Sequence, residues 1–146
     1  MDIQTKDGLQ SYLSSRYDKR IQFGTENEMR SSFIQDIFDL NFGAALNGLK
    51  LIKKSYPADR KVYRRVRRDF DAVISQMCLE TTPILEKITS IRDLVEAGHH
   101  LTKGECINLV TEYAERNHNR DLPITRQAME EIYTIFQEWE NETHVS

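Results

Sequence analysis

Apolar side chains recur along most of the chain at spacings of three and four residues, which is the repeat of one face of an α-helix. The longest such stripe lies between Pro57 and Glu80 and consists of Val62, Val66, Phe70, Val73, Ile74 and Met77. Proline suits the first turn of a helix, because an amide proton there would have no intrahelical acceptor. We therefore expect one long helix over residues 57–80.

Other segments with the same repeat are separated by short polar or glycine-containing stretches. We expect these helices over residues 7–20, 26–54, 83–97, 102–116 and 125–140. Asn41 and Gly43 leave open whether residues 26–54 form one bent helix or two. Thr25 with Glu28, and Thr102 with Glu105, have the spacing of capping boxes. Gly98 is expected to end the helix that precedes it, and residues 141–146 are expected to be a frayed tail.

These patterns predict an all-α fold, namely a compact single-domain bundle of six or seven helices over residues 1–146. A chain of this length buries about 70% of its unfolded surface and needs no disulfide or metal for a core. Cys78 and Cys106 lie on apolar stripes, where free thiols behave as small hydrophobic groups. With no secretory pattern and no membrane-length apolar run, we expect a cytoplasmic protein that does not enter a membrane.

The net charge of −3 conceals an imbalance between the two halves of the chain. Residues 1–73 carry 14 Lys and Arg against 10 Asp and Glu, whereas residues 74–146 carry 6 against 13. Six cations fall within nine residues of the long helix: Arg60, Lys61, Arg64, Arg65, Arg67 and Arg68. Because the interleaved Val62 and Val66 should face the core, we expect all six cations on the outer side.

An arginine-rich helix face is typical of a phosphate-binding surface, because the guanidinium group pairs with two oxygens at once. Our leading hypothesis is a non-enzymatic binding or regulatory protein that contacts nucleic acid through these six residues, within a larger nucleoprotein assembly. Tyr63 would be able to stack on a base if it were exposed. Nothing in the pattern selects a base sequence, so binding should be electrostatic and salt-dependent. The cations could instead pair within the protein or between subunits, or only keep the protein soluble.

The acidic second half of the chain supports an alternative function. In that hypothesis the protein is an inhibitor, adaptor or immunity-type module, and its last helix presents Glu130, Glu131 and Glu138 to a basic target. Self-association between the basic and acidic halves is compatible with either hypothesis, and it would weaken as salt rises.

A third pattern consists of Arg92, Asp93 and His99. It loosely resembles the arginine–polar–spacer–histidine motif of the HEPN ribonucleases, which are also small helical bundles. The resemblance implies a metal-independent ribonuclease whose arginine and histidine converge across a dimer.

The chain otherwise lacks a phosphate-binding glycine loop and a nucleophile elbow. The adjacent His99 and His100 lack the four-residue spacing by which two histidines on one helix share a metal ion. We therefore expect no catalytic residues, no metal and no cofactor.

Overall fold

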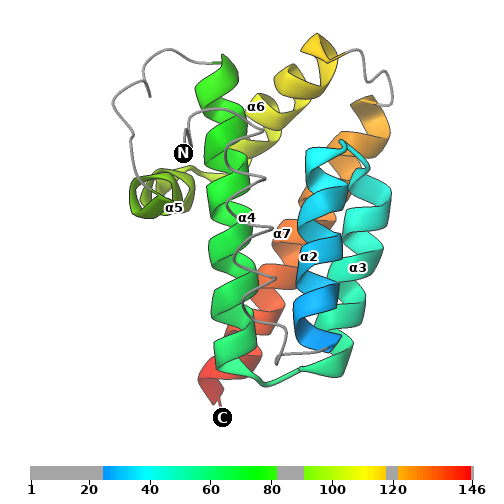
Figure 1. Cartoon of the computed structure of the whole chain (residues 1–146), viewed down its shortest axis with the longest axis vertical. Coiled ribbons are helices and arrows are strands. Elements are labelled where there is room, and N and C mark those ends of the chain that lie inside the picture. Colours follow the sequence, from blue (N-terminus) through cyan, green and yellow to red (C-terminus); the bar gives the residue numbers. More distant parts are fainter. Residues whose placement is uncertain (1–24, 82–90, 118–121, 146) are drawn as a thin grey trace.

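Helix α4 (Arg60–Thr81) runs along the long axis of the molecule, and four of the other described helices pack against it (Figure 1). The computed structural model describes residues 25–81, 91–117 and 122–145. Within these ranges there are six helices and no strand, which confirms the predicted all-α bundle. The other five helices are α2 (Thr25–Phe38), α3 (Phe42–Ser55), α5 (Ile91–His100), α6 (Lys103–Arg116) and α7 (Leu122–Val145). The helix expected over residues 7–20 and the first residues of the helix expected over 83–97 lie outside the described residues.

The core lies where α2, α4 and α7 meet. Rings from these three helices are completely buried there, and the Phe70 and Phe136 centroids are 5.0 Å apart, with Phe33 within 6.4 Å of both. Helix α3 packs against α2 and α7, α6 packs against α4 and α7, and α5 crosses the C-terminal half of α4 (Figure 1). The apolar stripe predicted for α4, from Val62 to Met77, is buried as expected.

Short polar residues, rather than Gly43 and Pro57, set the starts of α3 and α4. Two separate helices, not one bent helix, occupy residues 25–55, and Leu40 between them has a positive φ of 61°. The Asn41 side chain then accepts a hydrogen bond from the Ala44 amide and caps α3. Asp59 Oδ1 accepts from the amides of Lys61 and Val62, so α4 begins three residues after the expected Pro57.

The expectation that Gly98 ends its helix is wrong, because α5 continues through it to His100. A Cβ at Gly98 would overlap the carbonyl oxygen of Asp71 and lie 2.6 Å from Ser75 Oγ. The missing side chain therefore permits a close approach between α5 and α4, and does not provide a left-handed turn.

Helix α7 also continues past Glu140, where the sequence pattern predicted its end, to Val145. Thr143 is buried, and Glu142 forms an ion pair with Lys53 of α3 at 3.2 Å, so tertiary contacts support this last turn.

The capping box predicted at the start of α6 is confirmed. Glu105 N donates to Thr102 Oγ1 and Thr102 N donates to Glu105 Oε1, each at 3.1 Å. Hydrogen bonding of the Glu105 carboxylate to the Thr102 side chain and backbone amide lowers the pKa of Glu105.

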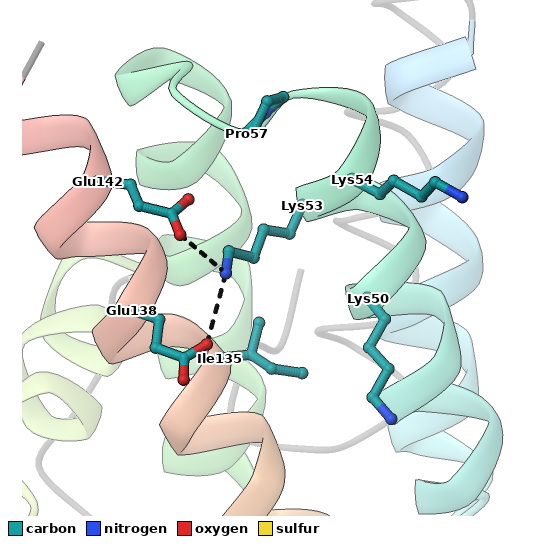
Figure 2. A pocket seen from close by; sticks show the side chains of 7 residues that line it. All are labelled: Lys50, Lys53, Lys54, Pro57, Ile135, Glu138 and Glu142. Atoms are coloured by element: carbon teal, nitrogen blue, oxygen red, sulfur yellow. Dashed lines mark hydrogen bonds and ion pairs between the residues drawn. The ribbon is translucent and has the colours of Figure 1, made fainter.

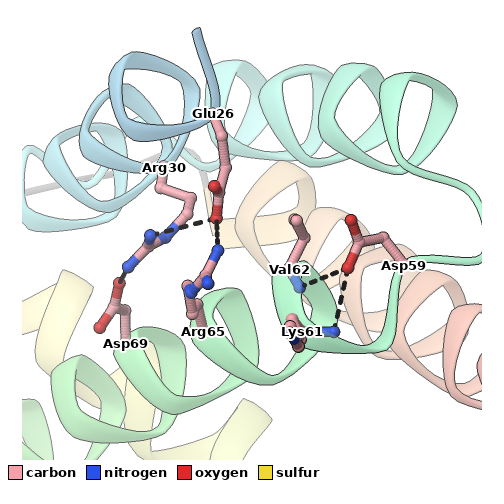
Figure 3. Close-up of polar contacts among 7 residues, drawn as sticks. All are labelled: Glu26, Arg30, Asp59, Lys61, Val62, Arg65 and Asp69. Carbon is pink, nitrogen blue, oxygen red and sulfur yellow. Dashed lines mark hydrogen bonds and ion pairs between the residues drawn. The ribbon is translucent and has the colours of Figure 1, made fainter. Parts of the chain in front are cut away.

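A buried ionic network joins α2 to α4 (Figure 3). Arg30 of α2 has no solvent-exposed surface, and it donates to Glu26 Oε1 at 3.3 Å and to Asp69 Oδ2 at 3.1 Å. Arg65 Nη1 lies 2.7 Å from the same Glu26 oxygen. Charges removed from water in this way must compensate one another, so the network specifies how α2 is placed against α4.

Substitution of Arg30 by Met is expected to lower the free energy of unfolding by about 3–5 kcal/mol, because Asp69 would remain buried without its cation. Urea unfolding followed by circular dichroism measures the change. Arg116→Met is the control, since its pair with Glu112 is exposed and should contribute less than about 1 kcal/mol. Equal losses in the two variants would contradict a structural role for the network.

The Gly98→Ala variant should be destabilised by about 1–3 kcal/mol, because the added methyl group would push α5 away from the α4 backbone. Gly104→Ala is the matched control, since a Cβ there meets nothing within 4 Å and replaces a helical glycine. That control should be neutral or stabilised by up to about 1 kcal/mol. The same urea unfolding measures both, and a neutral Gly98→Ala would show that the close approach is not required.

Candidate nucleic-acid interface

The two halves of α4 differ in how far they are covered. Every residue from Asp69 to Met77 is buried, whichever side of the helix it occupies. In the first half, four of the six predicted cations are exposed: Arg60, Lys61, Arg64 and Arg68. We refer to these four residues as the α4 cationic face.

The other two predicted cations are engaged inside the fold. Arg65 is only partly exposed, and its guanidinium pairs with Glu26 of α2. Arg67 Nε donates to Asp71 Oδ1 at 3.0 Å, and its Cζ lies 5.1 Å from the ring centroid of Phe136. A guanidinium over aromatic faces next to a buried carboxylate neutralises and covers that carboxylate, so Arg67 serves the core.

The α4 cationic face has no ion-pair partner among the residues that the structure describes. The acidic residues nearest to it along the chain already have other partners. Asp59 caps the helix, Asp69 accepts from Arg30 of α2, and Asp71 accepts from Arg67. Arg60, Arg64 and Arg68 are spaced by four residues, which corresponds to steps of about 6 Å along the helix axis. The arrangement is therefore a row of cations directed at solvent.

Tyr63 is not available to stack on a base. Its side chain is 9% exposed, and its ring packs edge-on against Trp139 at 5.4 Å and Phe136 at 6.2 Å. Burial raises the pKa of the Tyr63 hydroxyl to about 12. Because this ring belongs to the core, the structure removes the one base-stacking contact that the sequence suggested.

Two acidic residues of α7, Glu138 and Glu142, form ion pairs with α3 and not with α4. Lys53 of α3 pairs with Glu138 at 3.5 Å and with Glu142 at 3.2 Å, across a groove of about 500 Å³ that Lys50 and Lys54 also line (Figure 2). Glu130 and Glu131, predicted with Glu138 as a protein-binding set, are exposed on α7. In the described part of the chain, no ion pair joins α7 to the α4 cationic face.

The residues of the HEPN-like pattern lie on α5. Arg92, Asp93 and His99 are exposed, and Arg92 and His99 are seven residues apart, which puts them on one side of the helix. His99 Nδ1 lies 3.7 Å from Oδ2 of the buried Asp71, a contact that sequence reasoning missed because α4 and α5 are joined through tertiary packing. Burial raises the pKa of Asp71, although Arg67 and His99 act in the opposite direction.

Two features of the described residues bear on nucleophilic and metal-binding chemistry, namely the state of a buried thiol and the grouping of possible metal ligands. Cys106 is buried next to Tyr133, and burial raises the pKa of its thiol, which disfavours the reactive thiolate. No three His, Cys, Asp or Glu side chains in the described ranges are grouped so as to hold a metal ion. The side chain of Cys78 lies outside the described residues.

Comparison with protein-family models, curated proteins and solved structures gives no match to this chain. Among the described residues, no helix is both long and apolar enough to cross a membrane.

Arg67 and Arg64 should respond to substitution in different ways, although they are three residues apart on α4. Arg67→Gln is expected to lower the free energy of unfolding by about 1–3 kcal/mol, because buried Asp71 loses its charged donor. Arg64→Gln removes an exposed cation and should change it by less than about 0.5 kcal/mol. Urea unfolding of both variants tests this division, and equal effects would contradict it.

Proposed function

We propose that this protein is a non-enzymatic nucleic-acid-binding protein that holds the phosphate backbone through the α4 cationic face. The observation that carries the proposal is the exposure of Arg60, Lys61, Arg64 and Arg68 on one side of one helix, without a carboxylate partner in the described residues. Like charges one helical turn apart repel each other by a few tenths of a kcal/mol, and a bound polyanion would relieve that repulsion.

The shape of the cationic face supports phosphate as the ligand. Steps of about 6 Å between Arg60, Arg64 and Arg68 are similar to the separation of consecutive phosphates along one strand. Each guanidinium is able to pair with two oxygens of one phosphate. Because the aromatic ring nearest in sequence, Tyr63, is buried, the proposal is for backbone contact without base readout.

The triple variant Arg60→Gln/Arg64→Gln/Arg68→Gln tests the proposal. Fluorescence anisotropy with a labelled short duplex DNA, measured across a salt series, should show affinity reduced at least about tenfold at low salt. The slope of log K against log salt should become shallower by about 3, since each lost phosphate contact contributes about 0.9. The three side chains are exposed, so the fold should persist.

A control variant with the same loss of charge separates the cationic face from net charge. Lys103, Arg116 and Arg126 are exposed on α6 and α7, and their triple substitution by Gln should leave the affinity within about twofold of wild type. Equal weakening in both triple variants would show that only overall charge matters. Absence of binding by the wild-type protein at low salt would contradict the proposal.

An alternative is a basic protein partner that binds the exposed Glu130 and Glu131 of α7. Glu138 contributes less to such a surface, because Lys53 already pairs with it. If the wild-type protein fails to bind nucleic acid, Glu130→Gln/Glu131→Gln in a binding assay with a basic protein is the next measurement.

A further inference from the structure

Beyond Arg68, the side of α4 that carries the cationic face is covered by helix α5. Asp71 and Ser75 follow Arg64 and Arg68 along the same side of α4, at helical spacings of three and four residues. Gly98 of α5 sits directly over these two residues. A Cβ on Gly98 would overlap the Asp71 carbonyl oxygen and lie 2.6 Å from Ser75 Oγ. The row of exposed cations therefore ends where α5 crosses α4.

His99 stands at that crossing. Its side chain is 68% exposed, and its Nδ1 lies 3.7 Å from the carboxylate of Asp71, which is three residues beyond Arg68. Three residues of helix correspond to about 4.5 Å of rise, so His99 is placed about one turn beyond the last exposed arginine of the row. The contact with Asp71 places one edge of the imidazole against α4, and the rest of the ring is exposed close to the end of the row.

We propose that His99 is a fifth member of the nucleic-acid interface and contacts the phosphate that follows the one held by Arg68. Protonation of the imidazole adds a positive charge to the row, so the affinity for nucleic acid increases as the pH falls. This inference rests on the proposed function of the α4 cationic face, and it adds a pH-dependent contact to it.

The charged and titratable groups that lie against His99 belong to α4 and α5, and the next ones along the chain begin α6. On α4, Asp71 faces the imidazole and is shared with Arg67, whose guanidinium lies on the other side of the carboxylate. On α5, the His100 ring centroid is 6.1 Å away, and Glu96 precedes His99 by three residues. Helix α6 begins shortly afterwards, with the charged residues Lys103 and Glu105, the second held by Thr102.

Asp71 sets the lower limit of a useful pH range. Burial raises the pKa of its carboxyl, so it takes up a proton at a higher pH than an exposed aspartate does. Binding is therefore compared between about pH 8 and about pH 6, an interval over which histidine side chains generally gain charge. A constant ionic strength keeps screening equal at both values.

The test uses the full chain and the same labelled duplex DNA, with wild type, His99→Gln and His99→Lys. Wild type should bind about two- to fivefold more tightly at the lower pH, which is the effect of one added exposed ion pair. His99→Gln should match wild type at the higher pH and show no such gain. His99→Lys, which stays charged, should bind tightly at both values and so exclude loss of folding as the cause.

The His100→Gln variant is the matched control, because His100 is the exposed neighbour on the same helix. It should keep the pH dependence of wild type. A gain that survives in His99→Gln, or disappears in His100→Gln alone, would overturn the assignment to His99 while leaving the α4 cationic face intact. Failure of the proposed function itself has a different signature, since the Arg60/Arg64/Arg68 triple variant would then bind as well as wild type at both pH values.

Discussion

Two carboxylates, those of Asp69 and Asp71, are buried in the middle of α4, on different sides of the helix. A buried carboxylate is costly unless a cation and hydrogen bonds replace the water that it has lost. Asp69 forms an ion pair with Arg30 of α2. Asp71 pairs with Arg67 of its own helix and lies next to His99 of α5. These pairs join α2 and α5 to two different sides of α4.

The packing of α2 and α5 against α4 explains which cations of α4 stay exposed. Helix α2 contacts one side of α4 through Glu26 and Arg30, whereas α5 covers the opposite side only beyond Asp71. The stretch between Arg60 and Arg68 on that second side stays open to solvent. Arginines of one short segment therefore differ in role, because Arg65 and Arg67 pair with buried carboxylates and the exposed arginines do not.

Local spacing was enough to predict most helices and their inner faces. The stripe from Val62 to Met77 and the capping box of Thr102 and Glu105 involve neighbours within one or two turns, so the sequence alone reveals them. The prediction that Gly98 ends its helix is wrong because two kinds of glycine look alike in the sequence. One ends a helix in a left-handed turn, and the other allows a second helix to pack closely against it. The predicted end of α7 at Glu140 is wrong for a related reason, since Glu142 in its last turn pairs with Lys53, which belongs to α3 and is distant in sequence.

The sequence by itself determined that the protein is helical, which apolar residues face inward, and that one helix carries a dense group of cations. Only the tertiary structure decided which of those cations remain exposed. Glu26 and Arg65 are 39 residues apart, and Lys53 and Glu138 are 85 residues apart, so no local spacing indicates that either pair forms. Each pair depends on how whole helices pack, because packing brings a carboxylate to one cation and leaves another in water.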